Sequence, residues 1–150
     1  MVPRVLLSIR CPGAREHLRA LLEREYFEVI EVPADGLEVA RLSGALHPQV
    51  VVLAQELAGL TGRAAAAAIH EAQPKTPVIL LTPPATAAEI GTALAAGIRG
   101  CVFDTDPAEN LVRAVYDVSR GDAYLSPAVL RVLFEPYLPP APLGDERSGS

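Results

Sequence analysis

The sequence predicts one α/β domain in which a parallel sheet of five strands lies between two layers of helices. Short apolar runs rich in β-branched residues alternate along the chain with longer segments of helical periodicity. Each connection between strands is long enough for a crossover and too long for a hairpin, which favours parallel pairing. The 150 residues suffice for a single core. For five strands joined by right-handed crossovers, we expect the doubly wound strand order 2-1-3-4-5.

The first third of the chain contains two strands and two helices. Residues 4–9 are almost continuously apolar, which is typical of a strand buried on both faces. Residues 14–24 repeat leucine at helical spacing, with charged residues on the other face. Residues 27–32 alternate apolar and acidic residues, as an edge strand with one wetter face does. Asp35 is placed to cap a helix that runs to about Leu46.

The middle of the chain repeats the alternation. Residues 50–54 form an apolar, β-branched run that ends at Ala54. The five alanines at 64–68 predict a helix from 63 to 73, because alanine has the highest intrinsic helix propensity. Residues 78–82 form another buried strand, which two prolines end abruptly.

The last third contains one short strand, at 100–103, and three helix starts. Thr86 is followed three residues later by Glu89, which is a capping-box pattern for a helix that ends before Gly97. The pairs 106–107 and 126–127 each place a capping residue before a proline suited to the first helical turn. The second of these pairs predicts an extra helix at the C-terminal end. Its surroundings are rich in apolar residues.

Open α/β sheets bind ligands in the crevice at the carboxyl ends of their strands. With strands one and three side by side, Ile9, Arg10 and Ala54 should converge at this crevice, and Thr82 and Asp104 should border it. Alanine offers no nucleophile, ligand or proton there. No nucleophile–base pair or metal-ligand set is evident, so we expect no enzyme activity.

Composition narrows the classes of function further. The net charge of -5 and the single lysine, Lys75, argue against a nucleic-acid-binding face on this chain. The chain shows no signal segment and no apolar run near the roughly 18 residues of a membrane span, so we expect a cytoplasmic protein without membrane contact. Cys11 and Cys101 form no CxxC motif and are expected to be buried thiols in a reducing compartment. The three histidines have no metal-ligand spacing.

The chain as far as about residue 135 resembles the receiver domain of bacterial two-component response regulators, most closely the LuxR/FixJ (NarL) type. Single segments of this resemblance are generic α/β patterns, but their order and spacing are specific. The segments are Val5-Leu6-Leu7, the helix 15–23, Asp35-Gly36, residues 48–53, 59–62, 76–82, 95–100, 110–115 and 121–129.

The resemblance implies a phosphorylation site whose residues are not retained here. A receiver is phosphorylated on an aspartate that ends the third strand, a position matched by Ala54. Two acidic residues after the first strand help to hold Mg²⁺, and Ile9 and Arg10 match them. A lysine ends the fifth strand, where Asp104 stands, and only Thr82 keeps its family identity. We therefore expect an atypical receiver with no metal and no Mg²⁺ cofactor.

Two further positions bear on this expectation. The aromatic residue that works as a switch in the family matches Cys101, so the switch pair is lost as well. Glu56 could be proposed as a substitute acceptor, but it lies two residues beyond the strand end, where the in-line geometry of phosphoryl transfer is lost. An ion pair of Arg10 with Asp104 or Glu56 could close the pocket without metal, or Arg10 could point into solvent.

The main hypothesis is a phosphorylation-independent pseudo-receiver: the regulatory and dimerisation domain of a bacterial response-regulator-type transcription factor, which would bind DNA only through a helix-turn-helix domain absent from this chain. One alternative is a small-molecule sensor, and another is a stand-alone protein-interaction adaptor. The possible ligand pocket adds Ser8, Gln55, Glu56 and Pro83 to the five positions above.

We divide the chain into a pseudo-receiver at 1–122, a C-terminal linker helix at 123–138 and a proline-rich linker or disordered tail at 139–150. The proline-rich end favours a piece of a longer regulator over a complete protein. The expected partner is a second copy. The proposed dimer face consists of Leu18, Leu111, Val115, Val118, Val129, Leu130, Leu133 and Phe134, although these residues could also cover the domain's own core.

Overall fold

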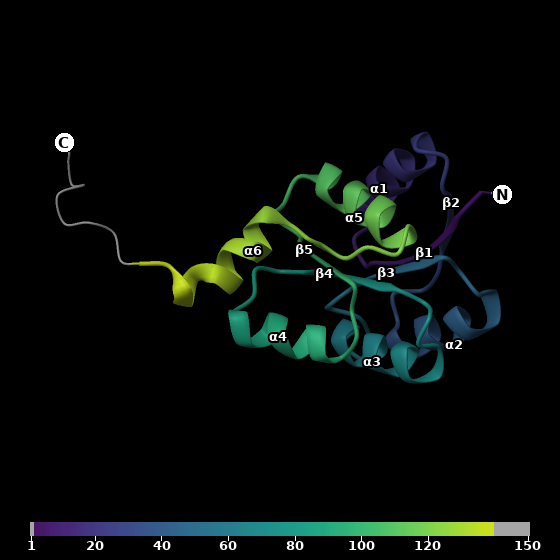
Figure 1. Ribbon diagram of the computed structural model, residues 1–150. Coiled ribbons are helices and arrows are strands. Elements are labelled where there is room, and N and C mark those ends of the chain that lie inside the picture. The colour runs from purple at the N-terminus through teal and green to yellow at the C-terminus, as the bar shows by residue number, and fades with distance from the viewer. Residues whose placement is uncertain (1, 140–150) are drawn as a thin grey trace.

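All the strands of the sheet run parallel, in the order β2-β1-β3-β4-β5-β6 (Figure 1). The computed structural model describes residues 2–139. The strands are β1 (Arg4–Ser8), β2 (Glu28–Glu31), β3 (Val50–Ala54), β4 (Val78–Thr82), β5 (Gly100–Phe103) and β6 (Tyr124–Leu125). The predicted fold class and the order of the five predicted strands are confirmed, and β2 lies at an edge as expected.

The sixth strand was not predicted. The sequence predicts a helix over residues 123–138, but Tyr124 and Leu125 instead pair with Gly100 and Cys101 of β5. The Tyr124 amide donates to the Arg99 carbonyl oxygen at 3.0 Å. A strand of two residues has no readable periodicity, so only the tertiary pairing defines it.

Helices cover both faces of the sheet (Figure 1). Helices α1 (Pro12–Arg24) and α5 (Ala108–Ser119) pack on one face. Helices α2 (Gly36–Leu46), α3 (Gly62–Ala72) and α4 (Ala87–Ala95) pack on the other. Helix α6 (Pro127–Phe134) lies against β5 and α4 and continues into the short 3₁₀ helix η1 (Glu135–Tyr137).

Successive strand residues pack alternately into two separate hydrophobic cores, one on each face of the sheet. In β1, Val5 and Leu7 face α1 and α5, whereas Leu6 faces the layer of α2 and α3. Burial of every side chain from Val5 to Leu7 explains why the sequence reads as a continuous apolar run. The two cores fix the sheet from both sides, and so fix the carboxyl edge where the strands end.

Most of the predicted helix boundaries are confirmed by their caps. The Asp35 carboxylate accepts from the Leu37 and Glu38 amides at 2.9 and 3.1 Å. Thr86 and Glu89 form the reciprocal capping box. Helix α1 begins at Pro12, two residues earlier than expected, because a proline suits the first turn.

One predicted cap is wrong. The Asp106 carboxylate does not cap α5 but accepts from the Phe103 amide at 2.9 Å, and Pro107 occupies the N-cap position. The carboxylate thus closes the turn after β5 instead of opening the helix.

In the part of the chain that the structure describes, no helix combines the length and the apolar character needed to cross a membrane. The predicted proline-rich segment lies, from residue 140 on, outside the described residues.

Candidate functional site

Four of the five positions that the resemblance matches to a phosphorylation site converge at the carboxyl edge of the sheet. Ile9 and Arg10 follow β1, Ala54 ends β3 and Asp104 follows β5, and all four line one hollow of about 410 Å³. Gln55, Glu56 and Pro83 also line it, as do Cys11, Ala14 and Leu81. Ile9, Arg10 and Ala54 come together because β1 and β3 are neighbours in the sheet, and Asp104 borders them.

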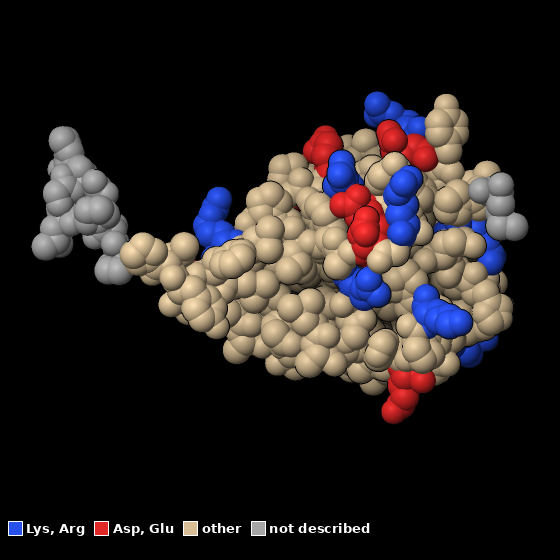
Figure 2. All heavy atoms as spheres, viewed as in Figure 1, with Lys and Arg blue, Asp and Glu red and all other residues tan. Residues whose placement is uncertain are grey.

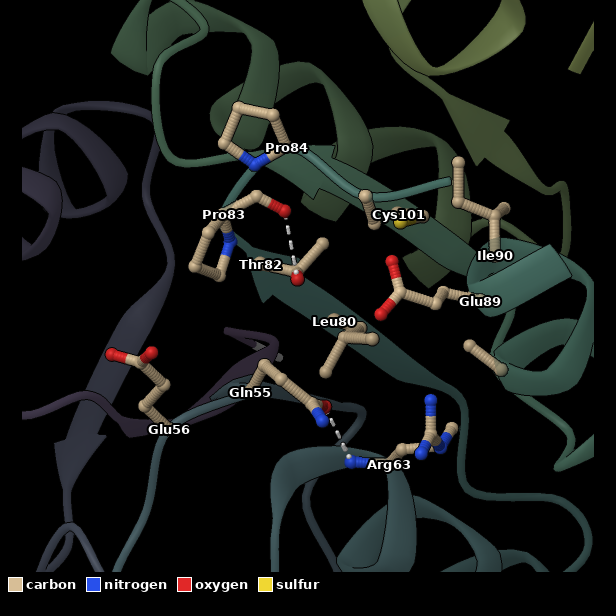
Figure 3. A pocket seen from close by; sticks show the side chains of 12 residues that line it. Gln55, Glu56, Arg63, Leu80, Thr82, Pro83, Pro84, Glu89, Ile90 and Cys101 are labelled. Atoms are coloured by element: carbon tan, nitrogen blue, oxygen red, sulfur yellow. Dashed lines mark hydrogen bonds between the residues drawn. The ribbon is translucent and has the colours of Figure 1, made fainter. Parts of the chain in front are cut away.

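Thr82 lines a different cavity. This second space, of about 170 Å³, lies between the end of β4, α3 and α4 (Figure 3). Cys101 contributes to it, while Gln55, Glu56 and Pro83 border both spaces. The single crevice expected from the sequence is therefore divided, because the segments that follow β3 and β4 lie between its two halves.

Ser8 lines neither of these two spaces. Its side chain is fully buried, and its hydroxyl donates to the Pro33 carbonyl oxygen at 2.8 Å. The hydroxyl ties the end of β1 to the chain that leaves β2. The prediction that Ser8 lines the ligand pocket is therefore wrong.

The predicted ion pairs of Arg10 are not formed among the described residues. No carboxylate of residues 2–139 lies within 4.0 Å of the Arg10 guanidinium, and Arg10 is exposed, as the alternative interpretation held. The neighbouring arginines are engaged instead: Arg15 and Arg19 both pair with Glu31, at 3.4 and 2.8 Å. The hydrogen bond to Glu31 is the main cause that raises the pKa of Arg19.

Glu56 and Asp104 supply the carboxylates that line this hollow, and neither stands at a position that the resemblance assigns to a magnesium ligand. Mg²⁺ takes oxygen ligands, usually from one or two carboxylates. Ile9, Arg10 and Ala54 stand at the positions that the resemblance assigns to the ligands, and they supply no carboxylate. Residues 2–139 also contain no group of three or more His, Cys, Asp and Glu side chains placed to hold a metal.

The cavity beside Thr82 has a neutral, apolar floor. Cys101 is fully buried there, and burial, with a smaller effect of the Asp106 charge, raises the pKa of its thiol to about 12. Leu80, Ile90 and Ala93 complete the apolar lining. The predicted burial of Cys101 is confirmed, but that of Cys11 is wrong, because Cys11 is exposed at the residue before α1.

Two charged residues at this cavity were missed by the sequence reasoning. Arg63 lies in the first turn of α3, and its guanidinium has no hydrogen-bond or ion-pair partner among residues 2–139. Glu89 extends from α4 toward the same space (Figure 3). Hydrogen bonds from Thr86 lower the pKa of Glu89, and the Arg63 charge adds a smaller lowering. Glu89 was noted only as a capping residue, and no sequence signal pairs it with a residue on α3.

The predicted dimer face is largely interior. Among its members, only Leu130 and Phe134 are exposed, and Leu133 is half-buried. The prediction is wrong for the other members, because each packs on the sheet of its own chain and is at most 5% exposed. These are Leu18, Leu111, Val115, Val118 and Val129.

The sequence pattern of the response regulator receiver domain matches residues 11–116, which is more than half of the chain. The chain belongs to this family. Among curated proteins, it is 29% identical over 112 residues to the oxygen regulatory protein NreC of Staphylococcus carnosus, covering 74% of this chain and 52% of NreC. The chain thus spans about half the length of the curated relatives that it matches.

Among solved structures, this receiver domain is similar to those of LuxR-family response regulators. A LuxR-family regulator from Aurantimonas sp. SI85-9A1 superposes with a TM-score of 0.85 at 27% identity, over 91% of this chain and 99% of the other. RcsB, in a structure of two dimers bound to two parallel DNAs, superposes with a TM-score of 0.79 at 20% identity, over 89% of this chain and 67% of that one. At this lower identity the likeness concerns the fold.

Proposed function

We propose that this receiver domain regulates without being phosphorylated. The observation that carries the proposal is Ala54 at the end of β3, where the methyl group has no atom able to accept a phosphoryl group. Ile9 and Arg10 at the end of β1 offer no anionic site for Mg²⁺, and Asp104 adds a negative charge where phosphate would need a cation. Each of these groups opposes phosphoryl transfer separately.

The wider role that we propose is the regulatory and dimerising part of a bacterial transcription factor. NreC is named as a regulatory protein, and it is about twice as long as the segment that this chain matches. DNA contact would then belong to a helix-turn-helix domain outside the present sequence. Residues 123–138 would form the linker to that domain, through α6 and η1.

The first prediction is that the chain takes up no phosphoryl group from acetyl phosphate in the presence of Mg²⁺. Intact-mass spectrometry checks this, with a receiver that carries the family's aspartate treated in parallel to show that the reagent is active. We expect the mass to stay unchanged, and beryllofluoride with Mg²⁺ to leave the melting temperature unchanged. A phosphoryl adduct on Glu56 or any other residue would contradict the proposal.

A second candidate function is sensing of a small molecule, favoured by the cavity between α3 and α4. Its volume of about 170 Å³ lies below the roughly 300–1,000 Å³ typical of drug-sized ligands, so it suits a small metabolite. Arg63, unpartnered within residues 2–139, and the ionised Glu89 offer one charge of each sign, above the floor around Cys101. This combination fits a dipolar molecule with a short apolar tail, such as an amino acid.

The second prediction follows from this cavity. One of the twenty common amino acids should raise the melting temperature by several degrees, because a ligand at 100 times its Kd stabilises by about 2.7 kcal/mol. Thermal-shift measurements check this, and Arg63→Ala should abolish the shift. The matched control is Arg41→Ala, which removes an exposed arginine on α2 that pairs with Glu38, away from the cavity. An unchanged melting temperature with all twenty would rule out this ligand class.

A further inference from the structure

The C-terminal helix exposes a row of apolar side chains. Leu130, Phe134 and Tyr137 are 38, 56 and 84% exposed, and Leu138 beside them is 57% exposed. Their spacing of four and then three residues puts the first three on one side of α6 and η1. We call Leu130, Phe134 and Tyr137 the α6 stripe. Large apolar side chains in a continuous row at the surface mark an interaction site.

The domain already covers the other side of this helix. Val129 is fully buried against the core that contains Cys101 and Phe103 of β5, and Val132 and Leu133 are partly buried against it. The α6 stripe therefore faces away from the core of its own chain. In Figure 1, α6 and η1 lead away from the sheet, and Figure 2 shows little charge on the surface around them.

Charges of opposite sign accompany the stripe on one flank. Arg131 follows Leu130 by one residue, and Glu135 follows Phe134 by one, so both lie on the same side of the stripe. Both are exposed, and within residues 2–139 neither has an ion-pair partner within 4.0 Å. A surface that runs from a positive to a negative charge along its axis complements the same surface turned by 180°.

We propose that α6 and η1 form a self-complementary interface with a second copy of this chain. The two helices would run antiparallel around a two-fold axis near Phe134, so that Arg131 of each copy faces Glu135 of the other. The α6 stripes then cover each other, with Phe134 and Tyr137 as the aromatic anchors. This inference specifies the dimerisation contained in the proposed function and rests on it.

The expected dimer is concentration-dependent. Two short helices bury less than the roughly 1,600 Å² of a standard stable interface, so the area alone does not make a permanent dimer. The charged flanks then contribute chiefly by fixing the antiparallel register. Substitution of the charged residues, and not only of the apolar ones, is therefore a sensitive test of the proposed interface.

The third prediction is tested by sedimentation equilibrium of the full 150-residue chain over a series of concentrations. Arg131→Glu and Glu135→Arg, made singly, should each raise the dimer Kd about tenfold, because like charges then face each other twice. The double variant should return the Kd to within about threefold of the original. Phe134→Glu should abolish the dimer, whereas the control Leu37→Glu, at an equally exposed leucine on α2, should not change it.

If something other than a second copy covers the α6 stripe, the same variants give different results. If Phe134→Glu lowers the melting temperature without changing the oligomeric state, the stripe packs against the chain's own segment, and the proposal is overturned. Charge variants that leave a wild-type dimer unchanged would equally overturn it. The proposed independence of phosphorylation is tested separately. A phosphoryl adduct would contradict it whether the chain is a monomer or a dimer.

Discussion

Replacement of Gly62 by alanine is expected to destabilise the fold by about 3 kcal/mol, which would lower the melting temperature by roughly 10 °C. Gly62 is the first residue of α3 and lies directly against the end of β3. A Cβ atom there would overlap the Ala54 carbonyl oxygen and lie 2.8 Å from the Gln55 Cα atom. These are backbone atoms, which cannot rotate aside as a flexible side chain can.

The backbone around Gly62 is also held by hydrogen bonds that an alanine would strain. The Gly62 amide donates to the Gln55 carbonyl oxygen at 2.9 Å, and the Arg63 amide donates to Gln55 Oε1 at 2.9 Å. Any shift that makes room for a methyl group therefore moves the wall between the two cavities. Loss of stability should be accompanied by a change in the environment of Arg63.

Gly91→Ala is the matched control for this substitution. Gly91 lies inside α4 and is exposed, and a methyl group added there would meet no atom of a neighbouring segment within 4 Å. Alanine is favoured over glycine in a helix by about 1 kcal/mol, so this variant should be slightly more stable than wild type. Urea unfolding of both variants measures the contrast. A Gly62→Ala protein as stable as wild type would show that α3 does not approach β3 this closely.

The parts of the fold that the sequence predicted correctly depend on local signals. The buried strands have apolar runs, the edge strand alternates, and Asp35 and Thr86 cap the helices that follow them. Gly97 was predicted to end α4, and its φ of 104° is one that glycine adopts readily. Such signals act within a few residues, so periodicity and capping chemistry suffice to read them.

The features that were missed depend on contacts between distant segments. Tyr124 and Leu125 become a strand only because β5 lies beside them. The convergence of Ile9, Arg10 and Ala54 was predictable from strand order. The separation of Thr82 from them was not, because the path of the loops between strand and helix decides it.

Helical periodicity also left two possibilities for the apolar residues of α1 and α5. An apolar stripe on a helix identifies a face that needs covering, but it does not say whether the chain's own sheet or a partner covers it. The sheet covers Leu18, Leu111 and Val115. Phe134 belongs to the same kind of apolar stripe, but no segment of the described chain covers it. The dimerisation proposal is therefore based on α6.

The last prediction concerns alkaline pH, where Cys101 should make the fold less stable. The pKa of this thiol is about 12 in the folded chain, compared with 9.0 for the ordinary group, because burial penalises the thiolate. Between these values the unfolded chain releases the proton and the folded chain keeps it. The contribution of Cys101 is therefore complete below pH 9 and is lost progressively as the pH rises toward 12.

The expected loss is about 1.4 kcal/mol per pH unit in this window, up to roughly 4 kcal/mol in all. Urea unfolding from about pH 7 to about pH 10.5 measures it as the difference between wild type and Cys101→Ala. Tyr124, whose pKa burial also raises, contributes to both proteins alike. Cys11→Ser, at the exposed thiol, should follow the wild-type curve. Parallel pH profiles for wild type and Cys101→Ala would mean that the thiol can ionise in place, and hence that water reaches the cavity floor beside Thr82.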